Sequence, residues 1–309
     1  MAKVLAMFPG QGSQFVGMGR DLLTEFPSVR TAFEEAEDAA RLNIRKLCFE
    51  GPEDELKLTA NTQPCILTVS VAVWRVLSEE TGLQPALFAG HSLGEYSAVV
   101  AAGKLPLGKA AYLVRRRGEA MQQAVPAGIG AMAAVMNVPA DDLKARAAKV
   151  SKPGSVVEVV NFNSPQQLVV AGHRPAVEAL CNGLEADGLR FVALPVSAPF
   201  HSSLMLPARE AMAPLLEEAP FAHTSQPVIA NLTGKIEPEY GPRFLIEQIN
   251  SAVLWTQTLE TSHQSGCDTY LEVGPGKVLF GLARKTLPKG PKLLHTEDVK
   301  QTIKDVQAL

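Results

Sequence analysis

One serine in the sequence is framed by two glycines, in Gly90-His91-Ser92-Leu93-Gly94. This is the G-x-S-x-G pattern of a nucleophile elbow, in which serine lies on a tight turn between a strand and a helix with its hydroxyl exposed. The flanks fit, because an apolar run (86–89) precedes the motif and a run of small residues (97–102) follows it. A β-carbon at either glycine would crowd such a turn. We therefore predict that Ser92 is a nucleophile, and the competing interpretation is a serine that only shapes a turn.

A serine nucleophile needs a general base, which in most such centres is a histidine. The candidates are His91, His173, His201, His223, His263 and His295. His91 adjoins Ser92 on a sharp turn and should point elsewhere. His201 follows an apparent inserted domain, where the returning chain can place an imidazole in an interdomain cleft, a common location for active sites. His201 is the predicted base, and the alternative is a loop histidine with no catalytic part.

A third candidate comes from the helix predicted over residues 107–125, which contains Arg115-Arg116-Arg117. Successive helical residues are rotated by about 100°, so the three arginines cannot share one environment. Arg117 falls on the apolar face, in line with Ala110, Leu113, Val114 and Met121. A guanidinium there needs a partner, and its planar fork suits a carboxylate. The sequence leaves open whether that carboxylate is internal or belongs to a substrate. Arg115 and Arg116 are predicted to be solvated.

Two patterns of secondary structure surround these residues. Residues 130–196 alternate as strand, helix, strand, strand, helix and strand, which is the order of a ferredoxin-like unit. Elsewhere short apolar strands alternate with longer helical stretches, as in an α/β domain with a parallel sheet. The strands predicted there are Val4–Phe8, Ala86–Ala89, Val228–Asn231 and Thr269–Val273. A final amphipathic helix, with Val299, Ile303 and Val306 on one face, should pack back on the sheet.

Composition excludes several classes of protein. The chain of 309 residues is long enough for about two domains, and a formal net charge of -3 lacks the basic footprint of nucleic-acid binding. The four cysteines are scattered without metal-ligand spacing, which favours reduced thiols and a cytoplasmic protein. The apolar run before Pro9 is too short for a signal peptide, and no run approaches the ~18 residues of a membrane span. We expect neither export by that route nor membrane insertion.

The candidate residues belong to a set of motifs that resembles a known family. The motifs are Phe8-Pro9-Gly10-Gln11-Gly12-Ser13-Gln14, Gly90-His91-Ser92-Leu93-Gly94-Glu95-Tyr96, Arg117-Gly118, Asn161-Phe162-Asn163-Ser164-Pro165-Gln166, His201 and Glu272-Val273-Gly274-Pro275-Gly276-Lys277. Their types and order resemble the malonyl-CoA:acyl carrier protein transacylases, over about residues 4–282. The similarity is close to the stand-alone enzymes of bacterial type II fatty-acid synthesis. The whole set is far more specific than any one motif.

The resemblance implies a fold and a division into domains. It implies an α/β-hydrolase-like large subdomain with a parallel sheet, formed by residues 1–128 and 198–309. An inserted ferredoxin-like small subdomain would occupy residues 129–197, in agreement with the strand and helix pattern there. The Gly10-Gln11-Gly12 loop is not read as a dinucleotide site, because that fingerprint needs a small residue where this chain has Phe15.

The resemblance also implies a role for each site residue. Ser92 would attack the malonyl thioester, His201 would act as general base and then general acid, and Arg117 would hold the malonyl carboxylate. The backbone N–H groups of Gln11 and Leu93 would form the oxyanion hole. The backbone carbonyl of Gln248 would orient His201. The family often has Asn-Pro where this chain has Ser251-Ala252, so the segment that contains Gln248 departs from the usual pattern.

The partners implied are malonyl-CoA, with CoA as product, and the phosphopantetheine thiol of holo acyl carrier protein. No metal and no tightly bound cofactor are expected, and the enzyme is expected to be a monomer. A basic stretch could meet CoA phosphates or an acidic carrier, or could be plain solvated surface; it consists of Arg284, Lys285, Lys289 and Lys292. Two other classes remain open: a serine esterase or thioesterase, which would not need the Arg117 clamp, and a carrier-binding protein with an idle Ser92.

Overall fold

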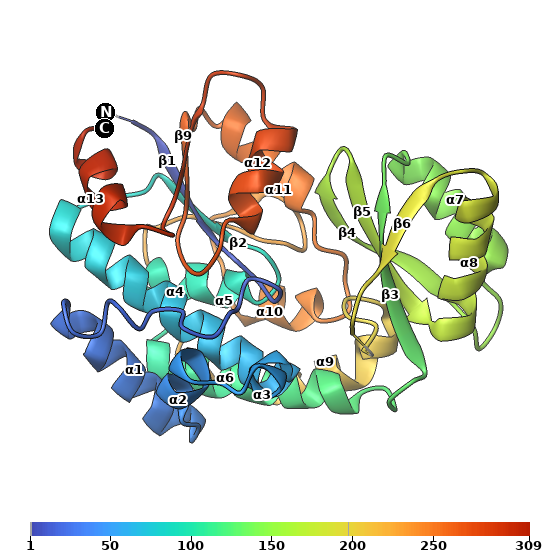
Figure 1. The fold of residues 1–309 in the computed structure, drawn as a ribbon, viewed down its shortest axis with the longest axis horizontal. Coiled ribbons are helices and arrows are strands. Elements are labelled where there is room, and N and C mark those ends of the chain that lie inside the picture. Colours follow the sequence, from blue (N-terminus) through green and yellow to red (C-terminus); the bar gives the residue numbers. More distant parts are fainter. Residues whose placement is uncertain (1, 197) are drawn as a thin grey trace.

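The chain forms two β-sheets, each with its own helices (Figure 1). The computed structural model describes residues 2–196 and 198–309. Met1 and Ser197, which are end residues of the predicted subdomains, lie outside the described residues. The larger sheet has six strands in the order β10-β9-β1-β2-β7-β8, and the smaller has four in the order β4-β5-β3-β6. The fold is therefore α/β, with a mostly parallel sheet and a separate antiparallel sheet.

The larger sheet is built around β1 (Val4–Phe8), whose five residues are all buried. It pairs in parallel with β2 (Leu87–Gly90) and β9 (Thr269–Glu272). A strand covered on both faces can be continuously apolar, as this one is. The predicted strands are present: β1 has the predicted bounds, and the ends of the other three differ by one or two residues. The strand predicted over Val228–Asn231 is only β7 (Val228–Ile229). The sequence did not indicate the two edge strands, β8 (Ile236–Glu237) and β10 (Lys292–His295).

Helices cover both faces of this sheet. On one face, Trp74 of α4 (Thr59–Thr81) packs edge-on against Phe8 and Phe88, with ring centroids 6.5 and 5.5 Å away. On the other face, α11 (Trp255–Gln264) and α12 (Val278–Thr286) bury the alternate residues of β1. Apart from the C-terminal helix, the other helices of this body are α1 (Pro27–Ala40), α2 (Ile44–Phe49), α3 (Glu53–Lys57), α5 (Gly94–Ala101), α6 (Leu107–Gln123), the 3-10 turn η1 (Ser203–Met205), α9 (Leu206–Glu217) and α10 (Pro242–Gln248).

The predicted C-terminal helix is α13 (Val299–Gln307), with Val299 and Val306 buried. Its main contacts are with α4, so it packs on the helix that covers the sheet, and the prediction that it packs directly on the sheet was wrong. A hydrogen bond from the Gln307 side chain to the Glu80 carbonyl oxygen lies at the same contact. Within the described residues, none of the helices combines the length and apolar character needed to cross a bilayer.

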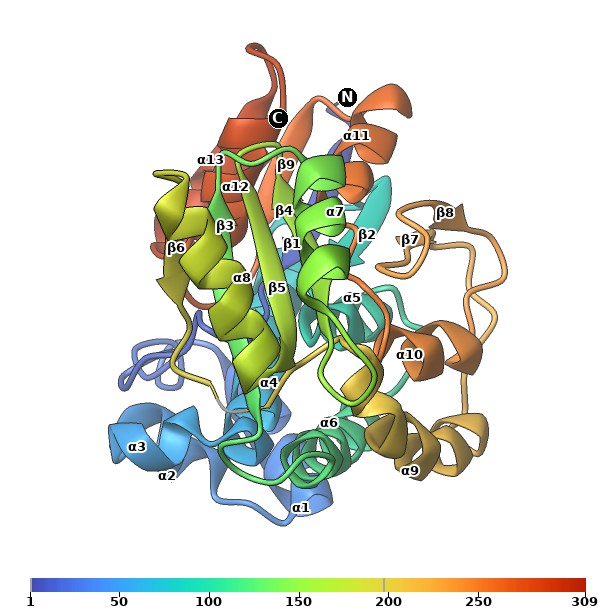
Figure 2. The same cartoon turned by 90° about the vertical axis from the view of Figure 1, so that its right-hand side faces the viewer.

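The small sheet follows the predicted order of elements. Its elements are β3 (Gly130–Met136), α7 (Ala140–Val150), β4 (Val157–Ser164), β5 (Gln167–His173), α8 (Arg174–Ala186) and β6 (Arg190–Ala193). Figure 2 shows α7 and α8 together in front of the four strands. The opposite face contributes Met132 and Val169 to a pocket shared with the larger sheet. Backbone hydrogen bonds between β4 and Val253 join the two parts beside that pocket.

Candidate active site

Ser92 lies on the turn between β2, which ends at Gly90, and α5, which begins at Gly94. Its φ of 52° is in the left-handed region, as expected for a strained turn. A β-carbon on Gly90 would lie 2.0 Å from the Gly94 carbonyl carbon, and one on Gly94 would lie 2.0 Å from the Phe8 carbonyl oxygen. The two glycines are therefore required by close backbone contacts, as the pattern predicted.

Asn231 holds this turn from the segment that follows the neighbouring strand β7. Its Oδ1 accepts a hydrogen bond from the Ser92 N–H at 2.6 Å, and its Nδ2 donates to the Gly90 carbonyl oxygen at 2.6 Å. Asn231 follows β7, which is parallel to β2, so the carboxyl ends of the two strands meet at one edge of the sheet. Nothing in the local sequence around Asn231 indicated this contact.

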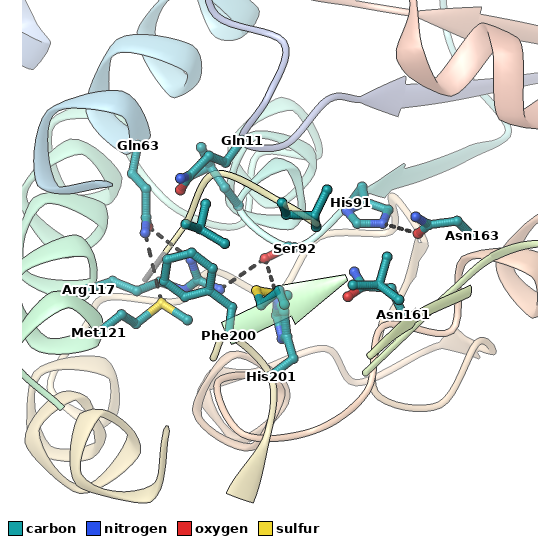
Figure 3. A pocket seen from close by; sticks show the side chains of 15 residues that line it. Gln11, Gln63, His91, Ser92, Arg117, Met121, Asn161, Asn163, Phe200 and His201 are labelled. Atoms are coloured by element: carbon teal, nitrogen blue, oxygen red, sulfur yellow. Dashed lines mark hydrogen bonds between the residues drawn. The ribbon is translucent and has the colours of Figure 1, made fainter. Parts of the chain in front are cut away.

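His201 faces Ser92 across the pocket (Figure 3). Its Nε2 lies 2.7 Å from Ser92 Oγ, and its Nδ1 lies 3.0 Å from the Gln248 carbonyl oxygen. A carbonyl oxygen only accepts, so Nδ1 carries the proton and the lone pair of Nε2 faces the serine hydroxyl. Burial, followed by the charge of Arg117, lowers the pKa of His201 to about 3. The imidazole is therefore neutral at pH 7, the state that a general base needs.

Arg117 projects from α6 into the pocket and is 1% exposed. Its Nη1 donates to Gln63 Oε1 at 2.9 Å, and its Nη2 donates to Gln248 Oε1 at 2.9 Å and to Ser92 Oγ at 3.2 Å. Its Nε has no partner. No Asp or Glu among the described residues forms an ion pair with Arg117, and burial lowers its pKa. Of the two partners left open by the sequence, a carboxylate from outside the chain is the one that this geometry favours.

The neighbouring arginines differ from Arg117 as their helical positions require. Arg116 is exposed, as predicted, and it also pairs with Glu119. Arg115 is half-buried, and it donates to the Asn61 side chain and the Ala60 carbonyl oxygen. The prediction that Arg115 is solvated was therefore wrong, because the first turn of α4 packs against that side of α6.

Gln11 and Leu93 line the same pocket, which has a volume of about 190 Å³. Within the described residues, neither backbone N–H donates a hydrogen bond to another protein group. Unpaired N–H groups beside a nucleophile are suitable donors for an oxyanion. The structure thus brings all six predicted site residues to one place: Gln11, Ser92, Leu93, Arg117, His201 and Gln248.

Other residues of this region were missed by sequence reasoning. Gln63 holds Arg117, and the side chain of Gln248 joins Arg117 to the buried carboxylate of Glu95. Glu95 lies within a quoted motif, so a signal was available, whereas Gln63 is an ordinary-looking residue of α4. His91 points away from Ser92, as expected, and its Nε2 lies 2.8 Å from Asn163 Oδ1 (Figure 3).

Together these contacts indicate the class of protein: a serine hydrogen-bonded to a neutral histidine, beside a buried arginine that has no acidic partner among the described residues, is an arrangement suited to covalent acyl transfer. Comparison with known proteins agrees, because the model of the acyl transferase domain family matches residues 6–308. The malonyl CoA-acyl carrier protein transacylase of Bacillus subtilis is 43% identical over 288 residues, which are 92% of this chain and 90% of that protein. The chain belongs to the malonyl CoA-acyl carrier protein transacylase family, and the resemblance seen in its motifs is confirmed.

Solved structures show the same fold. FabD from Acinetobacter baumannii has a TM-score of 0.95 and 38% identity to this chain. The match covers 100% of this chain and 99% of the FabD chain. A malonyl-transacylase in complex with a type II PKS acyl-carrier protein, PlMCAT:AntF, has a TM-score of 0.92 and 40% identity. That match covers 98% of this chain and 100% of the transacylase.

Proposed function

We propose that this protein transfers a malonyl group from malonyl-CoA to the phosphopantetheine thiol of an acyl carrier protein, through an ester on Ser92. The observation that carries the proposal is Arg117, a buried guanidinium within 3.2 Å of Ser92 Oγ and without an acidic partner among the described residues. Leaving such a charge unpaired is costly, so the site favours an acyl group that brings its own carboxylate. The names of the relatives and the complex with a carrier protein support the same reaction.

The first half-reaction acylates the enzyme. His201 Nε2 takes the Ser92 proton while Oγ forms a bond to the thioester carbonyl carbon. The tetrahedral intermediate then collapses, the bond from carbon to the CoA sulfur breaks, and the imidazolium returns the proton to the leaving thiolate. The Gln248 carbonyl, which accepts from Nδ1, keeps the imidazole in the required tautomer in place of an acidic third residue.

The oxyanion of that intermediate is stabilised by the backbone N–H groups of Gln11 and Leu93. Both residues line the pocket, and neither N–H is used by another described group. Fixed backbone donors need no reorganisation when charge develops, which is why they lower the barrier. Asn231 supports this arrangement because it fixes the turn that carries Leu93.

The second half-reaction reverses the first with another thiol. His201 takes the proton of the carrier's phosphopantetheine thiol, the sulfur attacks the ester carbon, and the bond to Ser92 Oγ breaks as Oγ regains the proton. CoA must leave before the carrier enters the same pocket, so ping-pong kinetics follow. The exposed basic stretch that begins at Arg284 and Lys285 is available to an acidic carrier or to CoA phosphates.

Arg117 has two effects on this chemistry. It binds the malonyl carboxylate, and its charge contributes to the low pKa of His201. The bound carboxylate offsets that charge, so the pKa of His201 rises when the correct substrate is present. A stronger base then faces Ser92 in the complex with malonyl-CoA than in the complex with acetyl-CoA.

We also propose that the chain is divided into two subdomains. Residues 1–128 and 198–309 form an α/β-hydrolase-like subdomain, which is supported by the strand, turn and helix around Ser92. Residues 129–197 form a ferredoxin-like subdomain, supported by the βαββαβ order. We place the enzyme in the cytoplasm because its four cysteines are buried free thiols, and we assign it as a monomer that uses no bound cofactor.

The test is intact-mass spectrometry after brief incubation with malonyl-CoA. Wild type should gain the mass of one malonyl group, Ser92→Ala should gain none, and added holo acyl carrier protein should remove the adduct and acquire it. The matched control is Ser97→Ala, which should be labelled like wild type: Ser97 is a buried serine of α5, the helix that follows Ser92, and its hydroxyl has no partner among the described residues. Labelling of Ser92→Ala, or release of free malonate in place of malonyl carrier protein, would overturn the proposal.

A further inference from the structure

Glu95 is a fully buried carboxyl group directly behind the nucleophile, and the reaction described above does not use it. Its Oε1 accepts hydrogen bonds from the Asn231 backbone N–H at 3.1 Å and from the Tyr240 hydroxyl at 2.7 Å. Its Oε2 accepts from Gln248 Nε2 at 2.5 Å. No described Lys or Arg pairs with it directly. Burying an acid this deeply costs free energy, which points to a role that a neutral side chain would not serve.

Each side-chain oxygen of Glu95 holds a residue that in turn holds the reacting groups. Asn231, anchored at its backbone by Oε1, clamps the Ser92 N–H and the Gly90 carbonyl with its side chain. Gln248, anchored by Oε2, accepts from His201 through its backbone carbonyl and from Arg117 through its side chain. One carboxylate therefore supports both sides of the site.

The orientation of the Gln248 amide shows why the support must be an acceptor. Gln248 Nε2 donates to Glu95 Oε2 and to the Ser92 carbonyl oxygen, so both of its protons face groups that only accept. The amide oxygen is thereby directed to Arg117. A protonated or amide side chain at position 95 could offer a proton to Gln248, and this would weaken the preference for the orientation that holds Arg117.

The charges around Glu95 favour the same arrangement. Arg117 on α6 is separated from Glu95 by the Gln248 amide, so the carboxylate balances the guanidinium without occupying the donors meant for a substrate. The other titratable groups nearby are Tyr96 on α5 and Tyr240, which Glu237 in turn faces. Burial raises the pKa of Glu95 to about 7, whereas Tyr240, Gln248, Asn231 and Arg117 all act to lower it.

We propose that Glu95 is a positioning residue for acyl transfer, which acts in its ionised form through Gln248 and Asn231 to hold Arg117, His201 and Ser92 in their reactive arrangement. This inference rests on the proposed function, since it assigns Glu95 a part in that reaction. The rate of acylation would then depend on the ionisation of Glu95, in addition to the protonation states of His201 and Ser92.

The experiment measures kcat/KM for CoA release from malonyl-CoA between about pH 6 and pH 8, since this parameter reports ionisations of the free enzyme. Wild type should lose activity by about tenfold as the pH falls across this range, because Glu95 gains a proton. His201 stays neutral throughout and cannot produce this change. Glu95→Gln should be about 10- to 100-fold slower at pH 8, as expected for misplaced reacting groups, and should lack the acid limb.

Tyr240→Phe is the second variant, and it keeps the carboxylate while it removes one hydrogen bond that lowers its pKa. Its acid limb should move to higher pH, which a merely structural role for Glu95 would not produce. If Glu95→Gln fails to fold, Tyr240→Phe decides alone. An acid limb retained in Glu95→Gln, or unshifted in Tyr240→Phe, overturns the inference. Failure of wild type to form the malonyl ester overturns the proposed function as well, so the two failures are distinguishable.

Discussion

Replacing Arg117 by methionine should change which acyl group the enzyme prefers. Arg117→Met keeps an unbranched side chain of similar length in a position that is 1% exposed, so it avoids most of the cavity that alanine would leave. It removes the guanidinium and all three of its hydrogen bonds. The loss of the bonds to Gln63 and Gln248 affects every substrate equally, whereas the loss of the carboxylate contact affects malonyl alone.

The size of the effect follows from the cost of losing one partner of a buried charged pair. Three of the five N–H groups of Arg117 donate to protein atoms, and the Nε–H and one Nη1–H have no partner among the described residues. Losing one partner of a buried charged pair costs about 2–5 kcal/mol. Since about 1.4 kcal/mol corresponds to a tenfold change in rate, a loss of 3–4 kcal/mol lowers kcat/KM for malonyl-CoA by about 10² to 10³ relative to acetyl-CoA.

The assay compares kcat/KM for the two CoA thioesters in wild type and Arg117→Met. The ratio of the two values isolates the carboxylate contact, because any general damage to the site cancels in it. Arg116→Met is the matched control: the same substitution one residue earlier in α6, at an exposed side chain, should leave the ratio unchanged. If Arg117→Met slows malonyl and acetyl transfer equally, the assignment of Arg117 to the substrate carboxylate is wrong.

Two further predictions concern stability. Gly94→Ala should lower the free energy of unfolding in urea by about 3 kcal/mol or more, because the new β-carbon would lie 2.0 Å from the Phe8 carbonyl oxygen. Gly183→Ala in α8, with no atom within 4 Å of the added carbon, should raise it by about 0.5–1 kcal/mol, and equal effects would contradict the packing argument. Burial raises the pKa of Glu272 to about 7 from an ordinary 4.5, so its favourable contribution is complete below pH 4.5 and is lost as the pH rises through 7. Glu272→Gln should therefore show a shallower fall of unfolding free energy between pH 4.5 and 7, and parallel curves would refute this.

Local sequence patterns were enough to predict the nucleophile, the buried face of one helix and the order of elements in the small sheet. The two glycines around Ser92 are required by backbone contacts of their own turn and its neighbouring strand, so a five-residue pattern was enough to find the nucleophile. Arg117 was placed on the buried face by helical periodicity, which depends only on neighbours along the chain. The βαββαβ order of the small sheet follows from alternating patterns in the same way.

Contacts between segments that are distant in the sequence could be identified only from the folded structure. Asn231 reaches Ser92 only because parallel strands bring their carboxyl ends together, and Gln63 reaches Arg117 only because α4 packs beside α6. The sequence suggested a carboxylate for Arg117 but could not say whether the chain itself supplied one. That question depends on which side chains surround the guanidinium. The amides of Gln63 and Gln248 contact it, and the carboxylate of Glu95 is linked to it only through Gln248. Local sequence patterns identify the reactive residues and the helix face on which each lies. The hydrogen-bond partners of these residues are determined by tertiary packing, which no short-range pattern encodes.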